Sequence, residues 1–306
     1  MSDPAGSSFL DDLRAGYTRM FSGNWVVPVF VAVWVVIVIL PLLVMVAHSF
    51  FEMKNYQVSY DAGFKTWNSL IDSGRWIAAV RTLRVVLVMT VVEFLIAFPF
   101  ALWLAKTCKS KVTKAVIITL LTIPFFLDPS SRTIIWRAIL GKNGIINTVL
   151  MELGIISEPM EWMLFSEFAV HFGMLAPYFP TMVFPIFLVV SLIDDHYLEA
   201  SRDLGASKLH TLFYVILPLS LPGIVAGAVF TMVPLMATWV EPEMLGGGFV
   251  NLLGPSVEAA IRNLKYPTAA ALSVFVIIVL ALLLALLILA TRRLGSIGDV
   301  FQTLRR

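Results

Sequence analysis

Long apolar runs separated by short polar connections dominate the pattern along this chain. The runs are about as long as a bilayer is thick, and none alternates between apolar and polar positions as a half-buried strand does. Because lipid offers no hydrogen-bond partner to peptide groups, we expect each run to cross the membrane as a helix. Six spans are predicted, at residues 25–47, 85–105, 115–127, 168–193, 219–240 and 269–290. The third is short and borrows residues 112–114, with lysine reaching the surface.

Composition supports an all-α integral membrane protein. Apolar residues make up 59% of the chain and charged residues 14%, against roughly 25% charged in ordinary globular proteins. The net charge of +2 gives no argument for a nucleic-acid partner. Cys108 is the single cysteine, so an internal disulfide and a cysteine-ligated metal cluster are excluded.

Charge in the connections predicts how the chain is oriented. The segment from Lys106 to Lys114 holds four lysines and no acid, which favours the cytoplasmic side. This orientation places residues 1–24 and the tail 292–306 in the cytoplasm, on either side of a six-span domain at 25–291. Within residues 1–24, apolar side chains recur near helical spacing. They indicate either a short helix on the membrane surface or a loosely ordered tail.

Motifs for catalysis are missing from the sequence. Gly141-Lys142-Asn143 lacks the glycine spacing and the hydroxyl of a phosphate-binding loop, so ATP hydrolysis by that route is excluded. The four histidines fall in four different segments, and we expect no catalytic residue, metal site or cofactor in this chain. An integral-membrane enzyme is therefore disfavoured.

The connection at 194–218 predicts two short helices instead of a simple tether. Asp194 or Asp195 can cap the first, and Gly205 suits a left-handed stop after it. The second helix is expected from about Ser207. Small residues on the first helix would allow close approach to a groove in a partner, although an ordinary hairpin packed on its own spans is the alternative.

Spacing in this connection resembles a known motif. Glu199-Ala200-Ser201, then Gly205, Val215, Leu217 and Pro218, are similar to the EAA loop of ABC importer permeases, in which EAA, three residues, G, nine residues, I, one residue and LP follow one another. Every gap matches. Ser201 replaces the second alanine and Val215 the isoleucine, and both changes are conservative in size.

A wider resemblance, over about residues 25–290, links the chain to permeases of spermidine/putrescine importers, and among these to the B-type subunit. The segments that carry it are Ile123-Pro124-Phe125-Phe126, Arg132, Leu204-Gly205-Ala206-Ser207-Lys208, Leu217-Pro218-Leu219, Pro222-Gly223-Ile224, Ala226-Gly227, Met232, Pro234 and Leu245-Gly246-Gly247. The polar start is longer than that type leads us to expect. The resemblance implies the type I permease fold in a bacterial inner membrane.

It also implies partners and residue roles. Separate ATPase subunits would hold ATP and magnesium, a second and different permease chain would complete a heterodimeric pore, and a periplasmic binding protein would deliver the solute. The residues that would couple this chain to the ATPase are Glu199, Ala200, Ser201, Gly205, Leu217 and Pro218. Glu199 would pair with a basic group, and Gly205 would set the angle between the two loop helices.

Proline and glycine interrupt the fourth and fifth spans, which makes these two helices the candidates for the transport path. Gly223 and Gly227 of the fifth span fit either that path or a seam of close helix packing, and the seam is favoured. Glu93 is the acid well inside a span. Three interpretations are open: Glu93 lines the transport path, it forms a salt bridge with a neighbouring span, or it is protonated and tolerated without a function.

Acids beside aromatic residues suggest an outer site for a polyamine. Trp239, Glu241 and Glu243 stand together after the fifth span, and Asp128 and Trp136 follow the third. Charge pairing and cation–aromatic contact would hold an organic cation there. An interfacial aromatic belt with solvated acids is the alternative.

Two other functions remain to be weighed against a polyamine importer subunit. The same importer class also carries opines, amino-acid derivatives, thiamine or ferric ions. An ion-coupled secondary transporter would favour several intramembrane acids and a duplicated chain. Glu93 alone qualifies, and no repeat is present.

Overall fold

The computed structural model describes residues 25–54 and 57–294, so the surface helix predicted within residues 1–24 and the tail from 295 lie outside the described part. Helices and π-helical turns (η) make up most of it. In chain order the elements are α2 (Val26–Trp34), η1 (Val35–Ile39), α3 (Leu40–His48), β1 (Glu52–Lys54), β2 (Gln57–Ser59), α4 (Lys65–Asp72), α5 (Arg75–Leu102), η2 (Trp103–Thr107), α6 (Lys111–Phe126), α7 (Pro129–Leu140), α8 (Ile145–Glu152), α9 (Glu167–Leu192), α10 (Asp195–Asp203), α11 (Lys208–Thr211), η3 (Leu212–Ile216), α12 (Leu217–Ala237), α13 (Val240–Gly246), α14 (Leu253–Arg262) and α15 (Tyr266–Leu294).

Five helices in the described part are long and apolar enough to cross a membrane. They are Val26–His48, Arg75–Thr107, Glu167–Leu192, Lys208–Ala237 and Tyr266–Leu289. The predicted third span corresponds to α6, whose 16 residues reach only about 24 Å at 1.5 Å per residue. It qualifies as a sixth span only when joined to the segment Pro129–Glu152, from which it is bent by 100°.

The second span is longer than the sequence indicated. Hydropathy predicted a start at residue 85, but α5 begins at Arg75 and includes two further arginines in its first turns. Contacts outside the apolar run explain this extension. Thr82 Oγ1 accepts a hydrogen bond from the backbone N–H of Leu253 at 2.9 Å, and Arg84 pairs with Glu167 at 3.1 Å.

The prediction of an all-α fold is confirmed, and the structure adds one short hairpin in the connection after the first span. Strands β1 and β2 form an antiparallel pair with Glu52 opposite Ser59. Salt bridges flank the pair, from Lys54 to Asp61 at 3.2 Å and from Lys65 to Glu52 at 3.3 Å. Strands this short leave no periodicity that could reveal them in the sequence.

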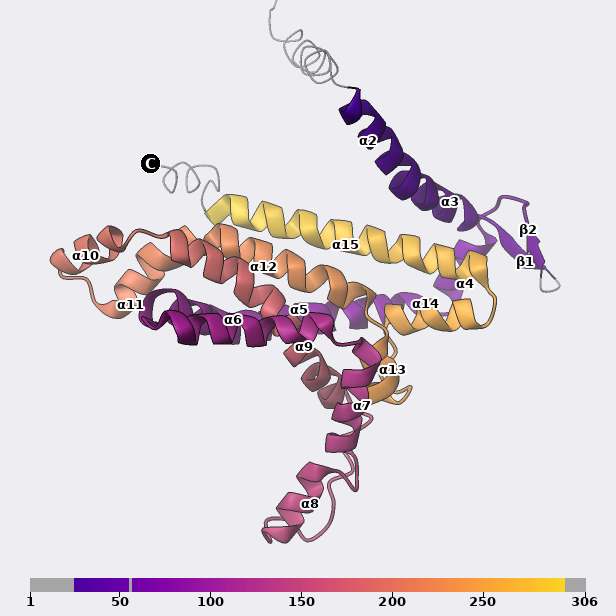
Figure 1. The fold of residues 1–306 in the computed structure, drawn as a ribbon. Coiled ribbons are helices and arrows are strands. Elements are labelled where there is room, and N and C mark those ends of the chain that lie inside the picture. The colour runs from indigo at the N-terminus through magenta and orange to yellow at the C-terminus, as the bar shows by residue number, and fades with distance from the viewer. Residues whose placement is uncertain (1–24, 55–56, 295–306) are drawn as a thin grey trace, which may run out of the picture.

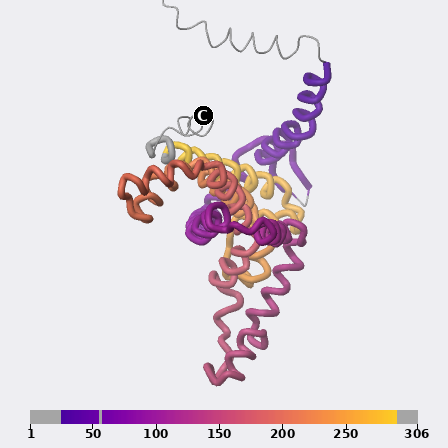
Figure 2. The backbone as a smooth tube through the Cα atoms, turned by 60° about the vertical axis from the view of Figure 1, so that its left-hand side comes forward, coloured from indigo at the N-terminus to yellow at the C-terminus, as the bar shows by residue number. Residues whose placement is uncertain are grey.

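Helix α9 lies at the centre of the fold and packs most extensively against α12 and α5. Loop helices α10 and α11, the α5–α6 connection and the described end of α15 gather at one end of the bundle (Figure 1). The β1–β2 hairpin and α4 lie at the opposite end. Helices α7 and α8 form an arm that projects from the bundle, and α2 leads away from it in both views (Figures 1 and 2).

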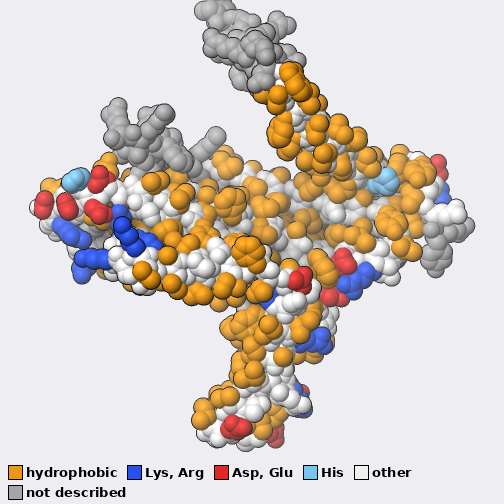
Figure 3. All heavy atoms as spheres, in the orientation of Figure 1, with side chains coloured by type: hydrophobic (Ala, Val, Ile, Leu, Met, Phe, Trp, Pro, Cys, Tyr) orange, Lys and Arg blue, Asp and Glu red, His pale blue; other side chains and the backbone are white. Residues whose placement is uncertain are grey.

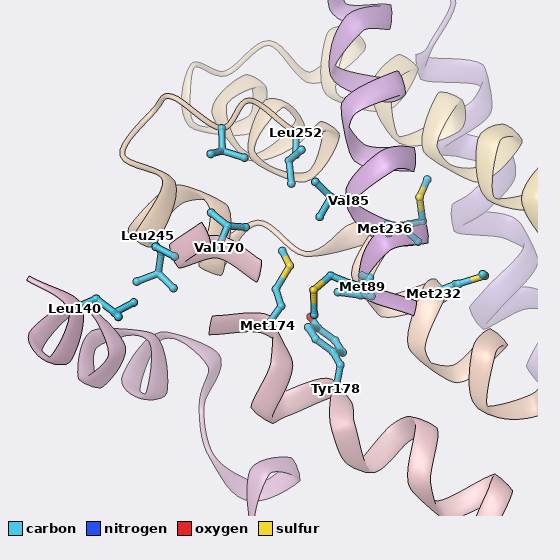
Figure 4. Close-up of a cluster of buried hydrophobic side chains, with 14 of the residues drawn as sticks. Val85, Met89, Leu140, Val170, Met174, Tyr178, Met232, Met236, Leu245 and Leu252 are labelled. Atoms are coloured by element: carbon cyan, nitrogen blue, oxygen red, sulfur yellow. The ribbon is translucent and has the colours of Figure 1, made fainter. Parts of the chain in front are cut away.

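Two apolar clusters fill the interior along α5, α9 and α12. The first contains Met89 of α5, Met174 of α9 and Met236 of α12, which are labelled in Figure 4. The second lies nearer the α10 end and includes Ala97, Met182 and Ala228. Helices α2, α3 and α6 have no buried residue, so their apolar side chains face outward (Figure 3). Such surfaces are expected where lipid or another membrane chain surrounds the protein.

Glycines allow α12 and α9 to approach closely. A Cβ atom on Gly223 would lie 2.7 Å from the carbonyl oxygen of Pro185, and one on Gly227 would lie 2.9 Å from Sδ of Met182. Both distances are too short for ordinary contacts. The packing seam favoured by the sequence is therefore confirmed for these two glycines.

Replacing Gly223 with alanine is expected to lower stability by about 1–3 kcal/mol, because the new methyl group meets backbone that cannot rotate away. The measurement is the thermal unfolding midpoint of the detergent-solubilised chain. Gly63→Ala is the matched control, since a Cβ there would have only an ordinary contact of 3.6 Å. Equal midpoints for the two variants would contradict the seam.

Candidate functional site

Helix α10 of the 194–218 connection begins at a side-chain cap. Asp194 has extended backbone angles, and its carboxylate accepts a hydrogen bond from the backbone N–H of His196 at 3.0 Å. The first N–H groups of a helix have no partner within it, so the bond and the negative charge both stabilise the start of α10. Of the two predicted caps, Asp194 is confirmed.

Gly205 ends this first helix in the left-handed conformation, with φ at +81°. Its N–H donates to the carbonyl of Arg202 at 2.8 Å. The next helix, α11, begins at Lys208, where the hydroxyl of Ser207 accepts from the N–H of His210. The stop at Gly205 and the restart at about Ser207 are thus confirmed.

A hydrogen bond between two buried hydroxyl groups fixes the angle of this turn. The Ser201 side chain on α10 and the Thr211 side chain on α11 lie 2.9 Å apart. Both groups are buried, so losing either would leave the other without a partner. Ser201, which replaces alanine in the family pattern, therefore joins the two loop helices into one rigid unit.

Lys106, in the last turn of the second span, ties the loop to the bundle. Its ammonium group donates to the carbonyl of Ile193 and to Oδ1 of Asp195, the latter at 2.7 Å. The hydrogen bond from Lys106, and then its charge, hold the pKa of Asp195 below the usual value. The loop is therefore anchored at its start to an element 89 positions away in the chain.

This anchor should weaken in acid. Because the pKa of Asp195 is lower in the folded chain, the stabilisation is present above the unfolded value of about 3.9 and is lost as pH falls through the folded value. The pair is exposed, so we expect a loss of roughly 0.2–1 kcal/mol. Unfolding midpoints between pH 6 and pH 3 measure it, and Lys106→Met should remove that part of the acid dependence. An unchanged acid profile in this variant would contradict the anchor.

Between α10 and α11 lies a hollow of about 730 Å³. Ala200, Ser201 and Gly205 line it with small groups, and Tyr197 and Tyr214 add aromatic walls. Among the described residues, no acidic or permanently charged side chain lines it. Such a hollow can accept protruding side chains of another protein. On the exposed surface of α10, Glu199 lies 3.4 Å from Nδ1 of His196.

The second loop helix is the beginning of the fifth span, which corrects the predicted start at residue 219. Helix α11, the turn η3 and α12 form one continuous rod from Lys208 to Ala237. The N–H of Leu217 donates to the carbonyl of Leu212, five positions earlier. This wider turn makes room for the ring of Pro218, which would clash with the preceding turn of a regular helix.

In α13, just after the fifth span, Glu241 is a buried structural partner. Its side chain is 1% exposed and pairs with Nη2 of Arg132 at 3.4 Å, while Thr238 donates to its other oxygen. Arg132 also donates to the carbonyl of Pro124 at 3.1 Å. The pair thereby links α6, α7 and α13.

Trp239 and Glu243 come together around Arg262. The guanidinium carbon lies 5.5 Å from the centre of the Trp239 ring, and Nη1 lies 3.9 Å from Glu243. Glu258 also contacts Arg262, at 2.9 Å. This arrangement is a cation site, occupied by a side chain of the chain itself.

The remaining two predicted outer residues make local contacts. Asp128 caps α7 by accepting from the N–H of Ser131 at 3.0 Å. Trp136 packs edge-on against Phe172, with ring centres 4.9 Å apart. The structure therefore distributes the acids and aromatics predicted for one outer site over several different contacts.

Glu93 is sealed within the bundle. Its side chain is 0% exposed, and neither oxygen has a hydrogen-bond partner among the described residues. Met89, one turn earlier, packs in the first apolar cluster, and Ala97, one turn later, packs in the second. Glu93 thus lies between the two clusters on α5, and of the three sequence-based interpretations the salt bridge is not observed within the described part.

Three contributors to these sites were missed in the sequence, namely Lys106, Thr211 and Arg262. Each acts through a partner that spacing does not reveal. A lysine at the end of a span is ordinarily read as a surface anchor, so only its contact with Asp195 distinguishes Lys106. Within the described residues, no group of three His, Cys, Asp or Glu side chains is placed to hold a metal ion.

Comparison with known proteins matches this chain to inner-membrane permeases of binding-protein-dependent transport systems. The model of a family described as the binding-protein-dependent transport system inner membrane component matches residues 87–296. The spermidine/putrescine transport system permease protein PotB of Escherichia coli K12 is 32% identical over 86% of this chain and 96% of its own length. PotB of Salmonella typhimurium SL1344 is 31% identical over 90% and 96%.

Solved structures show the same fold. A chain of a bacterial alginate ABC transporter, in complex with a periplasmic protein bound to an alginate pentasaccharide, superposes with a TM-score of 0.71. The match covers 94% of this chain and 98% of the other, at 15% identity.

Proposed function

This chain belongs to the family of binding-protein-dependent transport system inner membrane components, and from that membership we propose that it forms one half of the pore of a polyamine importer. It is a multi-pass inner-membrane permease of an ABC importer and the non-catalytic component of that system. The polyamine assignment is supported by the identity to proteins named as spermidine/putrescine permeases over nearly their whole length.

The 194–218 loop is the observation that carries the proposed mechanism. Its two helices are held at one angle by Gly205 and by the Ser201–Thr211 hydrogen bond, and a hollow opens between them. We assign this hollow, with Ala200 and Glu199 beside it, to a separate ATPase subunit that binds ATP and magnesium. Under this assignment, we propose that the α10 end of the bundle and both chain termini lie on the cytoplasmic side of the membrane.

Mechanical coupling follows from the continuity between the loop and the fifth span. Because the rod from Lys208 to Ala237 has no break at Leu217 or Pro218, a displacement of α11 moves α12 directly. Helix α12 packs on α9 through the glycine seam, so α9 must follow. Closure of two ATPase subunits would thus be converted into alternating access between the two permease subunits.

For the solute path, we propose two sites. At the outer site the solute replaces a bound arginine side chain, and at the inner site it meets Glu93. Trp239 and Glu243 hold the guanidinium of Arg262, and an ammonium group of a polyamine would replace it there. Asp128 and Trp136 lie on the α7 side of the entrance, and the Glu241–Arg132 pair holds the surrounding helices in place. Glu93 is 0% exposed, so it would meet the solute only after the helices that enclose it move.

The decisive test is reconstitution with the partner subunits. Vesicles that hold this chain, the ATPase and the second permease subunit should take up spermidine only with ATP and the binding protein. ATP turnover should rise when the loaded binding protein is added. Uphill transport by vesicles that hold this chain alone would instead establish a secondary transporter.

The solute is tested separately, because binding proteins set the selectivity of such systems. The cognate binding protein, purified and unfolded, should release spermidine or putrescine on mass analysis. Release of an opine, an amino-acid derivative, thiamine or ferric ion would replace the solute and leave the permease mechanism intact.

A further inference from the structure

A second hollow, of about 490 Å³, lies between the 194–218 loop and the last turns of the second span. Apolar side chains from the spans, among them Leu102, Leu212 and Ile216, form its floor. Three basic side chains, Lys106, Arg202 and Lys208, also line it, and no acidic side chain does. The lining therefore combines an apolar part with a strongly positive part.

Two of the three cations, Arg202 and Lys208, form no salt bridge within the described residues, although the charge of Arg202 acts on nearby Asp195. Lys106 is held by Asp195, whereas the exposed side chains of Arg202 and Lys208 make no hydrogen bond or ion pair with another described residue. Figure 3 shows lysine or arginine side chains at this end of the molecule, with acidic side chains also on its surface. An anion that enters the hollow would thus meet two positive charges that no described carboxylate contacts within salt-bridge distance.

The layout of the hollow matches an amphipathic anion. Leu102 lies at the end of α5, and Leu212 and Ile216 lie in the turn that leads into α12, so the apolar part belongs to the spans. Arg202 belongs to α10 of the loop, and Lys208 is the first residue of the rod that leads into α12. A ligand would place its apolar chain along the spans and its negative head at the loop, which is the orientation of a phospholipid in a membrane leaflet.

We propose that this hollow binds one anionic phospholipid, with its phosphate between Arg202 and Lys208 and the start of an acyl chain on Leu212 and Ile216. The inference rests on the proposed position of the loop at the cytoplasmic membrane surface. The bound lipid bridges the coupling loop and the second span, next to the Lys106–Asp195 contact. Anionic lipid in the membrane thereby stabilises the loop in the orientation seen here.

The test uses the assembled transporter with its ATPase and second permease subunit, in nanodiscs of phosphatidylcholine. A phosphatidylglycerol that carries a photoreactive group on its acyl chain is titrated in, and labelling of the 198–216 segment is measured. Each basic group near an anionic surface contributes roughly fivefold in affinity. Arg202→Gln combined with Lys208→Gln should therefore weaken labelling about 30-fold.

Two further variants separate the site from general surface attraction. Lys109→Gln with Lys111→Gln removes two exposed charges from the neighbouring connection outside the hollow, and labelling of 198–216 should persist. Leu209→Gln changes an exposed apolar lining residue without burying a polar group, and labelling should fall although every charge remains. Equal loss in the two charge variants would overturn the proposal.

Two competitors for the hollow are tested in the same nanodiscs. Loss of labelling on addition of millimolar inorganic phosphate would assign the hollow to free phosphate instead of lipid. Labelling that occurs only without the ATPase would mean that this partner covers the hollow, which also overturns the proposal.

Binding-protein-stimulated ATP turnover is recorded in parallel with labelling, which distinguishes the two proposals. Labelling without stimulation would refute the importer function alone. Stimulation without labelling would refute the lipid site alone.

Discussion

Replacement of Gly205 by valine is expected to abolish ATP-driven uptake. A left-handed backbone costs an L-residue about 1–2 kcal/mol, and a β-branched side chain is a clear outlier there. Apart from the two neighbouring residues, no described residue has an atom within 4 Å of the position that a Cβ would take, so the effect arises from the backbone angle and from bulk beside the hollow, not from a clash. Because the angle between α10 and α11 sets how the loop docks, a changed angle uncouples the ATPase.

The measurement is spermidine uptake into vesicles that hold the complete transporter, with solute capture by the binding protein as the reference. Gly154→Val is the matched control, because Gly154 also has a positive φ and open space but follows α8 in the projecting arm. We expect uptake to survive in that control and in Gly205→Asn, since asparagine tolerates the left-handed region. Normal uptake by Gly205→Val would refute docking through this turn.

Replacement of Arg132 by methionine is expected to lower the free energy of unfolding by about 3–5 kcal/mol. Glu241 is 1% exposed, and loss of Arg132 leaves its buried carboxylate with Thr238 as its remaining partner. Removing one partner of a buried ion pair is far more costly than removing both. The Pro124 carbonyl at the end of α6 would lose its donor as well.

Denaturant unfolding of the detergent-solubilised chain measures this loss. Arg137→Met on the same helix is the matched control, because Arg137 is exposed and lies over the Phe165 ring without a carboxylate partner. Addition of Glu241→Gln to Arg132→Met should restore part of the stability, since the amide removes the unpaired charge. Equal losses for Arg132→Met and Arg137→Met would show that the pair adds nothing.

Local signals in the sequence located the proposed coupling loop correctly. A cap at Asp194, a left-handed stop at Gly205 and a restart at about Ser207 depend on side chains within a few positions of each other. Apolar runs likewise located the spans, because a helix in lipid needs an apolar length and little else. The ends of the spans were less accurate, as at Arg75, where contacts with other elements extend the helix beyond its apolar part.

The roles of the acids Glu241 and Glu243 could not be predicted from local sequence signals. Glu241 and Glu243 are two positions apart and were assigned to one polyamine site. In the fold they point to different cations, Arg132 and Arg262. Arg132 lies 109 positions from Glu241. No spacing rule connects residues so distant, so their roles could not be separated in advance.

The sequence by itself determined the membrane helices and the two-helix loop of fixed spacing, because helix length, capping and turn geometry are set by neighbouring residues. The permease function was implied by the resemblance of its motifs to importer permeases. Only the tertiary structure decided that Gly223 and Gly227 form a seam, that Lys106 anchors the loop, and that Arg132 pairs with Glu241. These outcomes depend on which surfaces meet when helices pack. Whether a charge is buried, or two backbones approach closely, depends on both packed segments and cannot be read from either segment alone.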